Sequence, residues 1–265
     1  MIKYEELSKE LLVENNGQGM EIVHNEESFF FLVNIVEGSD KLIALSGGAL
    51  DQKKKSPPVY MRSKWKDEIK YNSIYIDDRT IHGNNLKIGW GVGNRDRHFL
   101  KDYVVIIKKI ADILGIKANN TMYYGSSMGG LMSVIMATMH KDSFAVIDNP
   151  QTNIFNYYQS YVDSLREKAL DGMTVEEINR DFPERVSMID AMLKYDNVPR
   201  IYYYQNNKCS FDMKYHYGPF KKQFEENGFD DGKVSYRLYS DAARGHSPQV
   251  KVKTLKIFDE IFSGI

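Results

Sequence analysis

A serine at the centre of a G-x-S-x-G pattern is the residue of this chain best placed to do chemistry. The pattern occupies residues 125–129, between a β-rich run at 121–124 and an apolar, helix-like run at 131–140. A sharp turn between a strand and a helix pushes a serine hydroxyl out at the edge of a sheet, and glycines relieve the crowding there. The pattern therefore predicts Ser127 as a nucleophile. A glycine-rich turn without chemistry is the alternative interpretation.

A serine hydroxyl is a poor nucleophile at neutral pH and needs a base to take its proton. Among the six histidines, His246 follows the last predicted strand, 233–239, and precedes the last predicted helix, 249–262. This position agrees with the chain order serine, acid, histidine that is found with the G-x-S-x-G pattern. We therefore predict His246 as the base. His82 and His216 also fall near loops and are weaker rivals.

A third group, an acid, is needed to hold the histidine ring in the correct tautomer. In the same chain order, this acid lies between Ser127 and His246. Asp212 fits because it follows the predicted strand at 200–204. Asp241, just before the histidine loop, is the rival. Either aspartate could instead serve only as a turn or helix N-cap residue.

Backbone N–H groups are expected to stabilise the negative charge that develops on a tetrahedral intermediate. One donor would be Met128, the residue after the predicted nucleophile. The other would be Gly47 or Gly48, which directly follow a predicted strand at 41–45. Glycines let the backbone of a loop approach a substrate closely. A simple strand-ending turn is the alternative interpretation of these glycines.

Three more residues are predicted to bind substrate. Trp90 lies among glycines in a long irregular stretch, 80–96, and loops of that length inside a domain are usually functional or mobile. Asn149 and Gln151 follow a predicted strand at 143–147, at the edge where open α/β sheets bind ligands. A tryptophan that fills a hydrophobic gap is the alternative interpretation of Trp90.

Composition argues against several classes of partner. The chain has 265 residues and a formal net charge of −1, which argues against binding nucleic acid or an anionic membrane through bulk electrostatics. Its single cysteine, Cys209, cannot form an internal disulfide. The first residues lack the pattern of a signal peptide, and no apolar run approaches the roughly 20 residues that span a bilayer. We expect a cytoplasmic protein without membrane insertion.

Motifs for metals and cofactors are missing from the sequence. There is no H-E-x-x-H pattern, and one cysteine cannot supply the paired cysteines of a zinc site. The glycines within 89–93 are not followed by the Lys-Ser/Thr of a phosphate-binding loop. We therefore predict a reaction that uses neither a metal nor a cofactor.

Strands and helices alternate over most of the chain, which predicts an α/β fold with a mostly parallel central sheet. Strands at 20–24, 29–35 and 41–45 are joined by short links, which predict an N-terminal antiparallel meander. Residues 154–195 show helical runs without a strand between them, which predicts a helical cap insertion. Because no linker divides the chain, residues 1–265 are expected to form a single domain.

With the 125–129 pattern, Asp212 and His246 in order, nearly the whole chain resembles the α/β-hydrolase superfamily. It also looks like hydrolase-like proteins of bacterial capsule and surface-polysaccharide biosynthesis and glycan O-acetyltransferases of accessory secretion systems. The stretches that carry this narrower resemblance are 45–48, 88–90, 124–130 and 149–153. The resemblance implies a glycan or glycoconjugate substrate. It further implies partner proteins of a polysaccharide or secretion system.

These predictions together describe a serine-dependent esterase or O-acyltransferase that forms an acyl-enzyme on Ser127. Water or a sugar hydroxyl would resolve that intermediate, and a hydrolase of another bond, such as a peptide bond, would use the same residues. A non-catalytic glycan-binding or assembly component with the same fold is the alternative. In that case Trp90, Tyr157 and Tyr158 would offer stacking surfaces to sugars.

Overall fold

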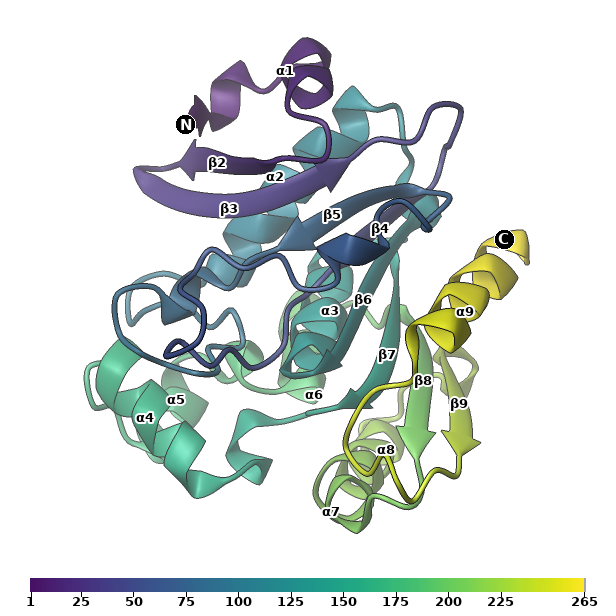
Figure 1. Cartoon of the computed structure of the whole chain (residues 1–265). Coiled ribbons are helices and arrows are strands. Elements are labelled where there is room, and N and C mark those ends of the chain that lie inside the picture. The colour runs from purple at the N-terminus through teal and green to yellow at the C-terminus, as the bar shows by residue number, and fades with distance from the viewer. Residues whose placement is uncertain (265) are drawn as a thin grey trace.

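A computed structural model describes residues 1–264. Within them, nine strands form one sheet in the order β1-β2-β3-β5-β4-β6-β7-β8-β9, with helices on both sides (Figure 1). The strands are β1 Ile2–Lys3, β2 Gly19–His24, β3 Glu27–Asn34, β4 Leu42–Leu45, β5 Asn72–Ile76, β6 Thr121–Ser127, β7 Phe144–Pro150, β8 Arg200–Asn206 and β9 Val234–Tyr239. The α-helices are α1 Lys9–Glu14, α2 Phe99–Ile113, α3 Met128–Met139, α4 Gln159–Ala169, α5 Val175–Asp181, α6 Met188–Tyr195, α7 Ser210–Asp212, α8 Gly218–Glu226 and α9 Lys251–Ser263.

The mostly parallel sheet that the sequence predicts is present. β4 pairs in parallel with β5 and β6, and parallel pairing continues through β7, β8 and β9. β2 and β3 form an antiparallel pair at the N-terminal side, and β3 is also antiparallel to β5. The predicted fold class, α/β with antiparallel strands before a parallel sheet, is confirmed.

The position of β4 differs from the predicted meander. β4 does not pair with β3, its predecessor in the chain, but lies between β5 and β6 and runs parallel to both. All four of its residues, Leu42–Leu45, are buried. A continuous apolar run of this kind is typical of a central strand covered on both faces, whereas a strand of a one-sided meander alternates apolar and polar residues.

Two hydrophobic clusters fill the faces of the sheet. Side chains of α2 and α3 belong to the larger cluster, and side chains of α9 belong to the smaller cluster on the other face. In α2, Leu100, Val104, Ile107, Ile110 and Ala111 recur at helical spacing on one face and are all buried. In α3, residues 128–138 are all buried. A helix that is apolar on all sides belongs in a core, so α3 is a rigid base for whatever its first turn presents.

The segment 154–195 is helical without a strand, as predicted. It contains α4, α5 and α6 together with two 3-10 turns, Ile154–Asn156 and Pro183–Arg185, and one isolated bridge pairs Ser187 with Asn153 just before the segment. α6 packs against α3. Figure 1 shows α4 and α5 near the end of the sheet to which the arrow of β7 points. The description of this segment as a cap over the site stays a prediction.

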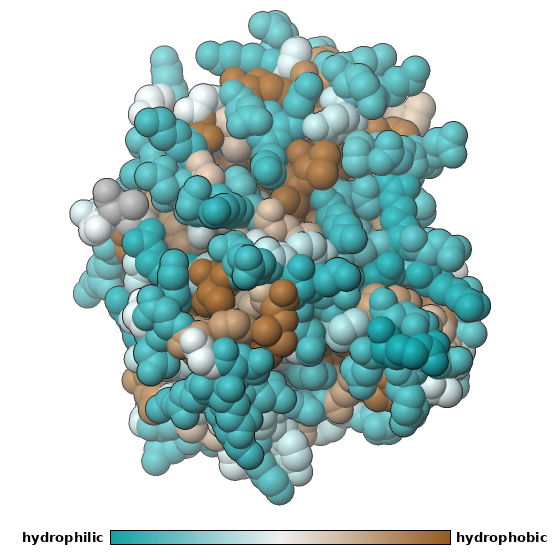
Figure 2. Space-filling view, turned by 180° about the vertical axis from the view of Figure 1, so that it is seen from behind, coloured by the Kyte–Doolittle hydropathy of each residue, from teal (hydrophilic) through white to brown (hydrophobic). Residues whose placement is uncertain are grey.

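The surface that Figure 2 shows is mostly hydrophilic, with hydrophobic side chains in small separate groups. Large exposed hydrophobic side chains occur on several different elements, among them Val13, Val105, Leu193, Leu238 and Val252. Scattered residues of this kind are normal on a protein surface. Within residues 1–264, no helix has both the length and the apolar character required to cross a membrane.

Strand β6 and helix α3 approach each other so closely that their backbones touch. A Cβ atom placed on Gly125 would overlap the carbonyl group of Gly129 and approach Ser133 Oγ to 2.8 Å. On the other side, a Cβ on Gly129 would overlap the carbonyl oxygen of Gly47, in the loop after β4. These glycines are therefore required by space, because backbone atoms cannot rotate away as a side chain can.

We predict that Gly125→Ala lowers the free energy of unfolding by about 1–3 kcal/mol, the usual effect of overpacking a core. Gly264→Ala is the matched control, because its added Cβ would meet its nearest neighbour at an ordinary 3.6 Å. Urea unfolding of both variants measures the difference. Equal stability of Gly125→Ala and wild type would show that β6 and α3 are packed less closely than described.

Candidate active site

The turn between β6 and α3 holds Ser127 in an unusual backbone conformation. Ser127 has φ 54° and ψ −126°, and the pairing of β6 with β7 shifts register between Ser126 and Ser127. A positive φ is uncommon for a residue other than glycine and persists only where surrounding structure enforces it. The N–H of Gln151 donates to the Ser127 carbonyl at 3.0 Å and supports the turn from β7.

Three predicted residues meet at this turn. His246 Nε2 lies 2.8 Å from Ser127 Oγ. His246 Nδ1 lies 2.9 Å and 2.8 Å from the two carboxylate oxygens of Asp212. The Asp212 side chain is fully buried, whereas that of His246 is 35% exposed. The arrangement gives the hydroxyl an acceptor for its proton and gives the imidazole a buried partner that fixes its tautomer.

The rival residues lie in other environments. Asp241 accepts from the backbone N–H of Arg244 at 3.2 Å and does not contact His246 through its carboxylate. His216 is buried, which lowers its pKa to about 4, and its Nδ1 accepts from the N–H of Thr152 at 3.3 Å. His82 pairs with Asp77 and stacks on Phe30. The geometry therefore favours Asp212 over Asp241 and His246 over the other two histidines.

The loop that carries His246 is fastened by Asn206, the last residue of β8. Its side-chain N–H groups donate to the carbonyls of Asp241 at 2.6 Å and Gly245 at 2.9 Å, and its Oδ1 accepts from the N–H of Asp241. Asn206 is not among the residues that the sequence predicts for the site. The available signal was a polar pair, Gln205 and Asn206, at the end of β8, which marks the same sheet edge but not a particular contact.

Asn149 performs a similar task from β7, and this differs from the prediction that it binds substrate. It is fully buried, and its amide donates to the Ser247 carbonyl at 3.1 Å and the Tyr239 hydroxyl at 2.9 Å. Its Oδ1 accepts from the backbone N–H of Asn206 at 2.7 Å. Because its donor and acceptor groups already have protein partners, Asn149 holds the histidine loop in place.

Trp90 also differs from the predicted substrate platform. The residue is fully buried, with Tyr157 against it in an edge-to-face contact at 6.2 Å between ring centres. A ring without an exposed face cannot stack on a sugar. Trp90 instead fills a gap in the core, as the alternative interpretation states. Its indole N–H donates to Oε1 of Gln151, and Gln151 Nε2 donates to Ser127 Oγ at 3.2 Å.

The predicted oxyanion groups lie beside the turn. Met128 is the first residue of α3, where backbone N–H groups have no partner within the helix and the helix dipole favours negative charge. The loop of Gly47 lies directly against Gly129. The N–H of Gly48 donates to the sulfur of Met61 at 3.0 Å, so a substrate must displace Met61 before using that donor.

Arg62 joins the loop after β4 to the serine turn, and sequence reasoning did not identify it. Its guanidinium donates to the Ser46 carbonyl at 3.2 Å and to Ser126 Oγ at 2.5 Å. It also lies over the rings of Trp65 and Tyr124. The two halves of the predicted oxyanion site are therefore connected through one side chain.

A buried carboxylate, Asp148, lies beneath the same edge. Burial raises its pKa to about 6, although hydrogen bonds from the Gln249 N–H and the Tyr239 hydroxyl, together with nearby Arg62, favour its charged form. Asp148 anchors the chain just after the histidine loop through the Gln249 N–H, at 2.6 Å. Its contribution to the site is therefore structural support.

Among the described residues, one group could supply three ligand atoms to a metal. Cys209, Asp212 and His246 each offer one such atom, and these atoms lie within 4.8 Å of one another. Two members are the predicted acid and base. Both ring nitrogens of His246 already have partners, Asp212 and Ser127, so a metal bound there would replace one of these contacts.

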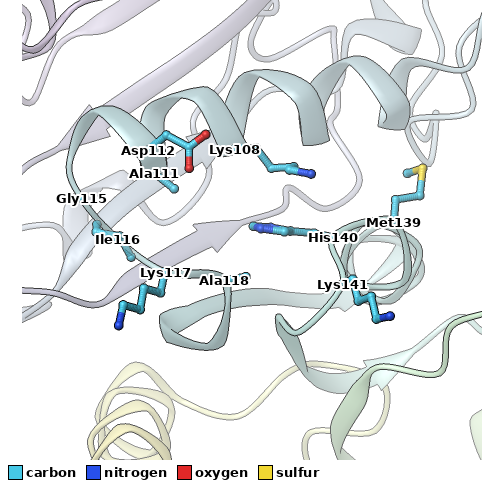
Figure 3. A pocket seen from close by; sticks show the side chains of 10 residues that line it. All are labelled: Lys108, Ala111, Asp112, Gly115, Ile116, Lys117, Ala118, Met139, His140 and Lys141. Atoms are coloured by element: carbon cyan, nitrogen blue, oxygen red, sulfur yellow. The ribbon is translucent and has the colours of Figure 1, made fainter.

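A cavity of about 490 Å³ lies away from this site (Figure 3). His140, Lys108 and Lys141 are among its lining residues. His140 follows the last residue of α3, whereas Ser127 precedes the first. At 1.5 Å per residue, α3 separates the two ends by about 20 Å. The cavity therefore lies at the opposite end of α3 from Ser127 and is not part of the site around the serine.

Known structures with the same architecture match almost the whole chain. The capsule O-acetyltransferase of Neisseria meningitidis serogroup A aligns with a TM-score of 0.65 at 14% sequence identity, covering 92% of this chain and 93% of that chain. The same enzyme, as a mutant, is also known in complex with CoA. An S-formylglutathione hydrolase from Agrobacterium tumefaciens aligns with a TM-score of 0.59 at 13% identity, with 92% of each chain covered.

A third similar structure is the glycosylation-associated Gap123 complex from Streptococcus agalactiae, with a TM-score of 0.65 at 14% identity. It is matched over 92% of this chain but 46% of that chain. No protein-family model and no curated protein matches the sequence. At these identities the likeness shows the fold alone. The chain has the α/β-hydrolase fold, as the sequence analysis expected.

We predict that the Nδ1 proton of His246 gives a far-downfield proton resonance in NMR, because it is held against the buried Asp212 carboxylate. Asp212→Asn should abolish this resonance, since an amide N–H at that place favours the other histidine tautomer. Asp241→Asn is the matched control and should retain it. If instead only Asp241→Asn lost the resonance, the partner of His246 would be Asp241 and not Asp212.

Proposed function

We propose that the protein is a serine esterase or O-acyltransferase that acts on a bacterial surface glycan or glycoconjugate. The observation that carries the proposal is the unbroken contact from Ser127 Oγ through the ring of His246 to Asp212. His246 lies within hydrogen-bond distance of both Ser127 and Asp212, which is the geometry required for acyl transfer through a covalent intermediate.

In the first half-reaction, Ser127 Oγ attacks the carbonyl carbon of an ester while its proton moves to His246 Nε2. The carbonyl π electrons move to oxygen, and the N–H of Met128 with an N–H of the loop at Gly47 and Gly48 would stabilise the resulting oxyanion. When the carbonyl re-forms, the bond to the leaving group breaks and His246 returns the proton to that group. The product is an acyl ester of Ser127.

In the second half-reaction, His246 takes a proton from water or from a sugar hydroxyl, and that oxygen attacks the acyl ester. Collapse of the second tetrahedral intermediate breaks the bond to Ser127 Oγ, which regains its proton from His246. Water yields hydrolysis and a sugar hydroxyl yields transfer. The residues around Ser127 supply the same steps in both cases.

Two lines of support favour a glycan. Among the structural neighbours, one is a capsule O-acetyltransferase and another a glycosylation-associated complex. In this chain, Tyr158 is 52% exposed and stacks on Phe211 at 4.6 Å between ring centres. Phe211 is half-buried and directly precedes Asp212, so an exposed tyrosine backed by a second aromatic ring, a surface of the kind that packs on sugar rings, lies beside the proposed acid.

We predict that a fluorophosphonate probe labels the wild-type protein and that the protein hydrolyses p-nitrophenyl acetate. Ser127→Ala should lose labelling, and Ser127→Ala and His246→Ala should each lower kcat by more than about 10⁴-fold, because nucleophile and base act as one unit. His82→Ala is the matched control, since His82 pairs with Asp77 away from the serine, and it should keep wild-type values.

A folded wild-type protein without labelling or turnover would contradict the enzymatic function and favour a non-catalytic glycan-binding component. If labelling and turnover are present, acetylated glycans test hydrolysis. Acetyl-CoA with a deacetylated glycan tests transfer, a choice of donor suggested by the CoA complex of the Neisseria enzyme. Release of free acetate or its appearance on the glycan separates the two reactions.

A further inference from the structure

Ser127 Oγ has a second hydrogen-bond partner besides His246. Gln151 Nε2 lies 3.2 Å from Ser127 Oγ, on a side chain that is fully buried. The backbone N–H of Gln151 donates to the carbonyl of the same serine at 3.0 Å. Gln151 therefore touches both the backbone and the reacting atom of the predicted nucleophile.

The orientation of this amide is fixed by its other neighbour. The oxygen and nitrogen of a glutamine side chain are normally assigned only through their hydrogen-bond partners. Here Oε1 faces the indole N–H of Trp90, a group that can only donate. If the amide were reversed, two donors would face each other in a buried place. The Gln151 N–H must therefore point at Ser127 Oγ.

Every hydrogen bond from Trp90 through Gln151, Ser127 and His246 to Asp212 therefore has a single direction. Trp90 donates to Gln151, Gln151 to Ser127, Ser127 to His246, and His246 to Asp212. The indole N–H of Trp90, which can only donate, lies at one end of this chain of hydrogen bonds, and the carboxylate of Asp212, which accepts, lies at the other. In such a chain each bond polarises the next, so the serine proton is directed at His246 Nε2.

We propose that Gln151 is a catalytic residue that donates to Ser127 Oγ, and that Trp90 is a positioning residue that acts through Gln151. The inference rests on the proposed function, because it concerns the same serine. The Gln151 N–H fixes the Oγ lone pairs before attack. It stabilises negative charge on Oγ while the proton leaves for His246, and again when Oγ departs from the acyl group.

The kinetic test removes each donor in turn. Gln151→Met keeps an unbranched side chain of similar length without the amide, and Trp90→Phe keeps a ring without the N–H. A hydrogen bond to a group that develops charge implies a loss of about 10- to 100-fold in kcat for p-nitrophenyl acetate, with KM little changed. Fluorophosphonate labelling should slow similarly. Wild-type kcat in folded Gln151→Met would overturn the proposal.

The role of Trp90 is tested by a double-mutant cycle. If Trp90 acts through Gln151, then Trp90→Phe should cause no further loss of kcat in the Gln151→Met background. Multiplicative losses would overturn the positioning role, because they would show that the ring acts independently. Asn72→Leu is the matched control, since Asn72 is a buried amide at the opposite end of the sheet. It should lower the melting temperature and leave kcat unchanged.

Gln151→Glu adds a pH-dependent readout that a structural role would not produce. An ionised glutamate still accepts from Trp90 but cannot donate to Ser127. When protonated, it does both. Burial raises the pKa of a carboxyl group, so the protonated form becomes accessible at moderately low pH. The ratio of variant to wild-type kcat/KM should therefore rise as pH falls. A ratio that is constant with pH would overturn the proposal.

An NMR measurement tests the link without relying on activity. The chain has two tryptophans, so a ¹⁵N-labelled protein gives two indole N–H signals, and Trp65 serves as an internal control. Gln151→Met should shift the Trp90 signal upfield and leave that of Trp65 in place. An unchanged Trp90 signal would overturn the link between Trp90 and Gln151.

The activity of the wild type and the activity of the Gln151 variants together distinguish failure of the proposed function from failure of this inference. A folded wild type without turnover or labelling would remove the proposed function, and with it the catalytic role of Gln151, whatever the indole signals show. A fully active wild type whose Gln151 variants keep wild-type kcat would remove this inference alone.

Discussion

The sheet edge that carries Ser127 depends on a contact between two backbones. β6 and α3 meet at Gly125 and Gly129 without an intervening side chain, and the chain has one residue, Ser127, in which to turn from strand to helix. The turn forces Ser127 to φ 54°. Such strain requires compensation from the surroundings, and the burial of α3 and the N–H bond from Gln151 supply it. The hydroxyl is thus positioned by the core of the protein rather than by a loop.

His246, the predicted base, reaches Ser127 on a loop, and buried amides hold that loop. Asn206 and Asn149 lie at the ends of neighbouring strands and are both fully buried. An amide carries a donor and an acceptor on one rigid plane, so each asparagine can bind two segments at once. Asn149 joins β8 to the loop of His246, and Asn206 makes three hydrogen bonds to the same loop. In a buried environment each of these bonds is strong and each unpaired group would be costly, which favours one loop conformation.

Local patterns in the sequence were sufficient for part of this arrangement. The G-x-S-x-G pattern and the order of acid and histidine singled out Ser127, Asp212 and His246, which lie together in the structure. Properties that depend on distant contacts could not be obtained in this way. Strand pairing is non-local, so β4 was placed beside the wrong neighbour. Arg62 contacts residues 16 and 64 positions away, and no spacing near it signals either contact. For Trp90, the sequence gives an aromatic ring in a glycine-rich stretch, but whether that ring is buried depends on residues far away in the chain.

The exposure of the base bears on the choice between hydrolysis and transfer. The Asp212 side chain is fully buried, whereas 35% of the His246 side chain is exposed. Solvent therefore has access to the group that would activate an acceptor. Water is present at a far higher concentration than any sugar hydroxyl, so an acyl-enzyme of the proposed kind would hydrolyse unless something excluded water. The protein alone leaves His246 partly exposed to water. Transfer would therefore require the bound acceptor itself to shield His246 from water. Binding of the acceptor, rather than the order of proton transfers, would then decide which reaction the same three residues perform.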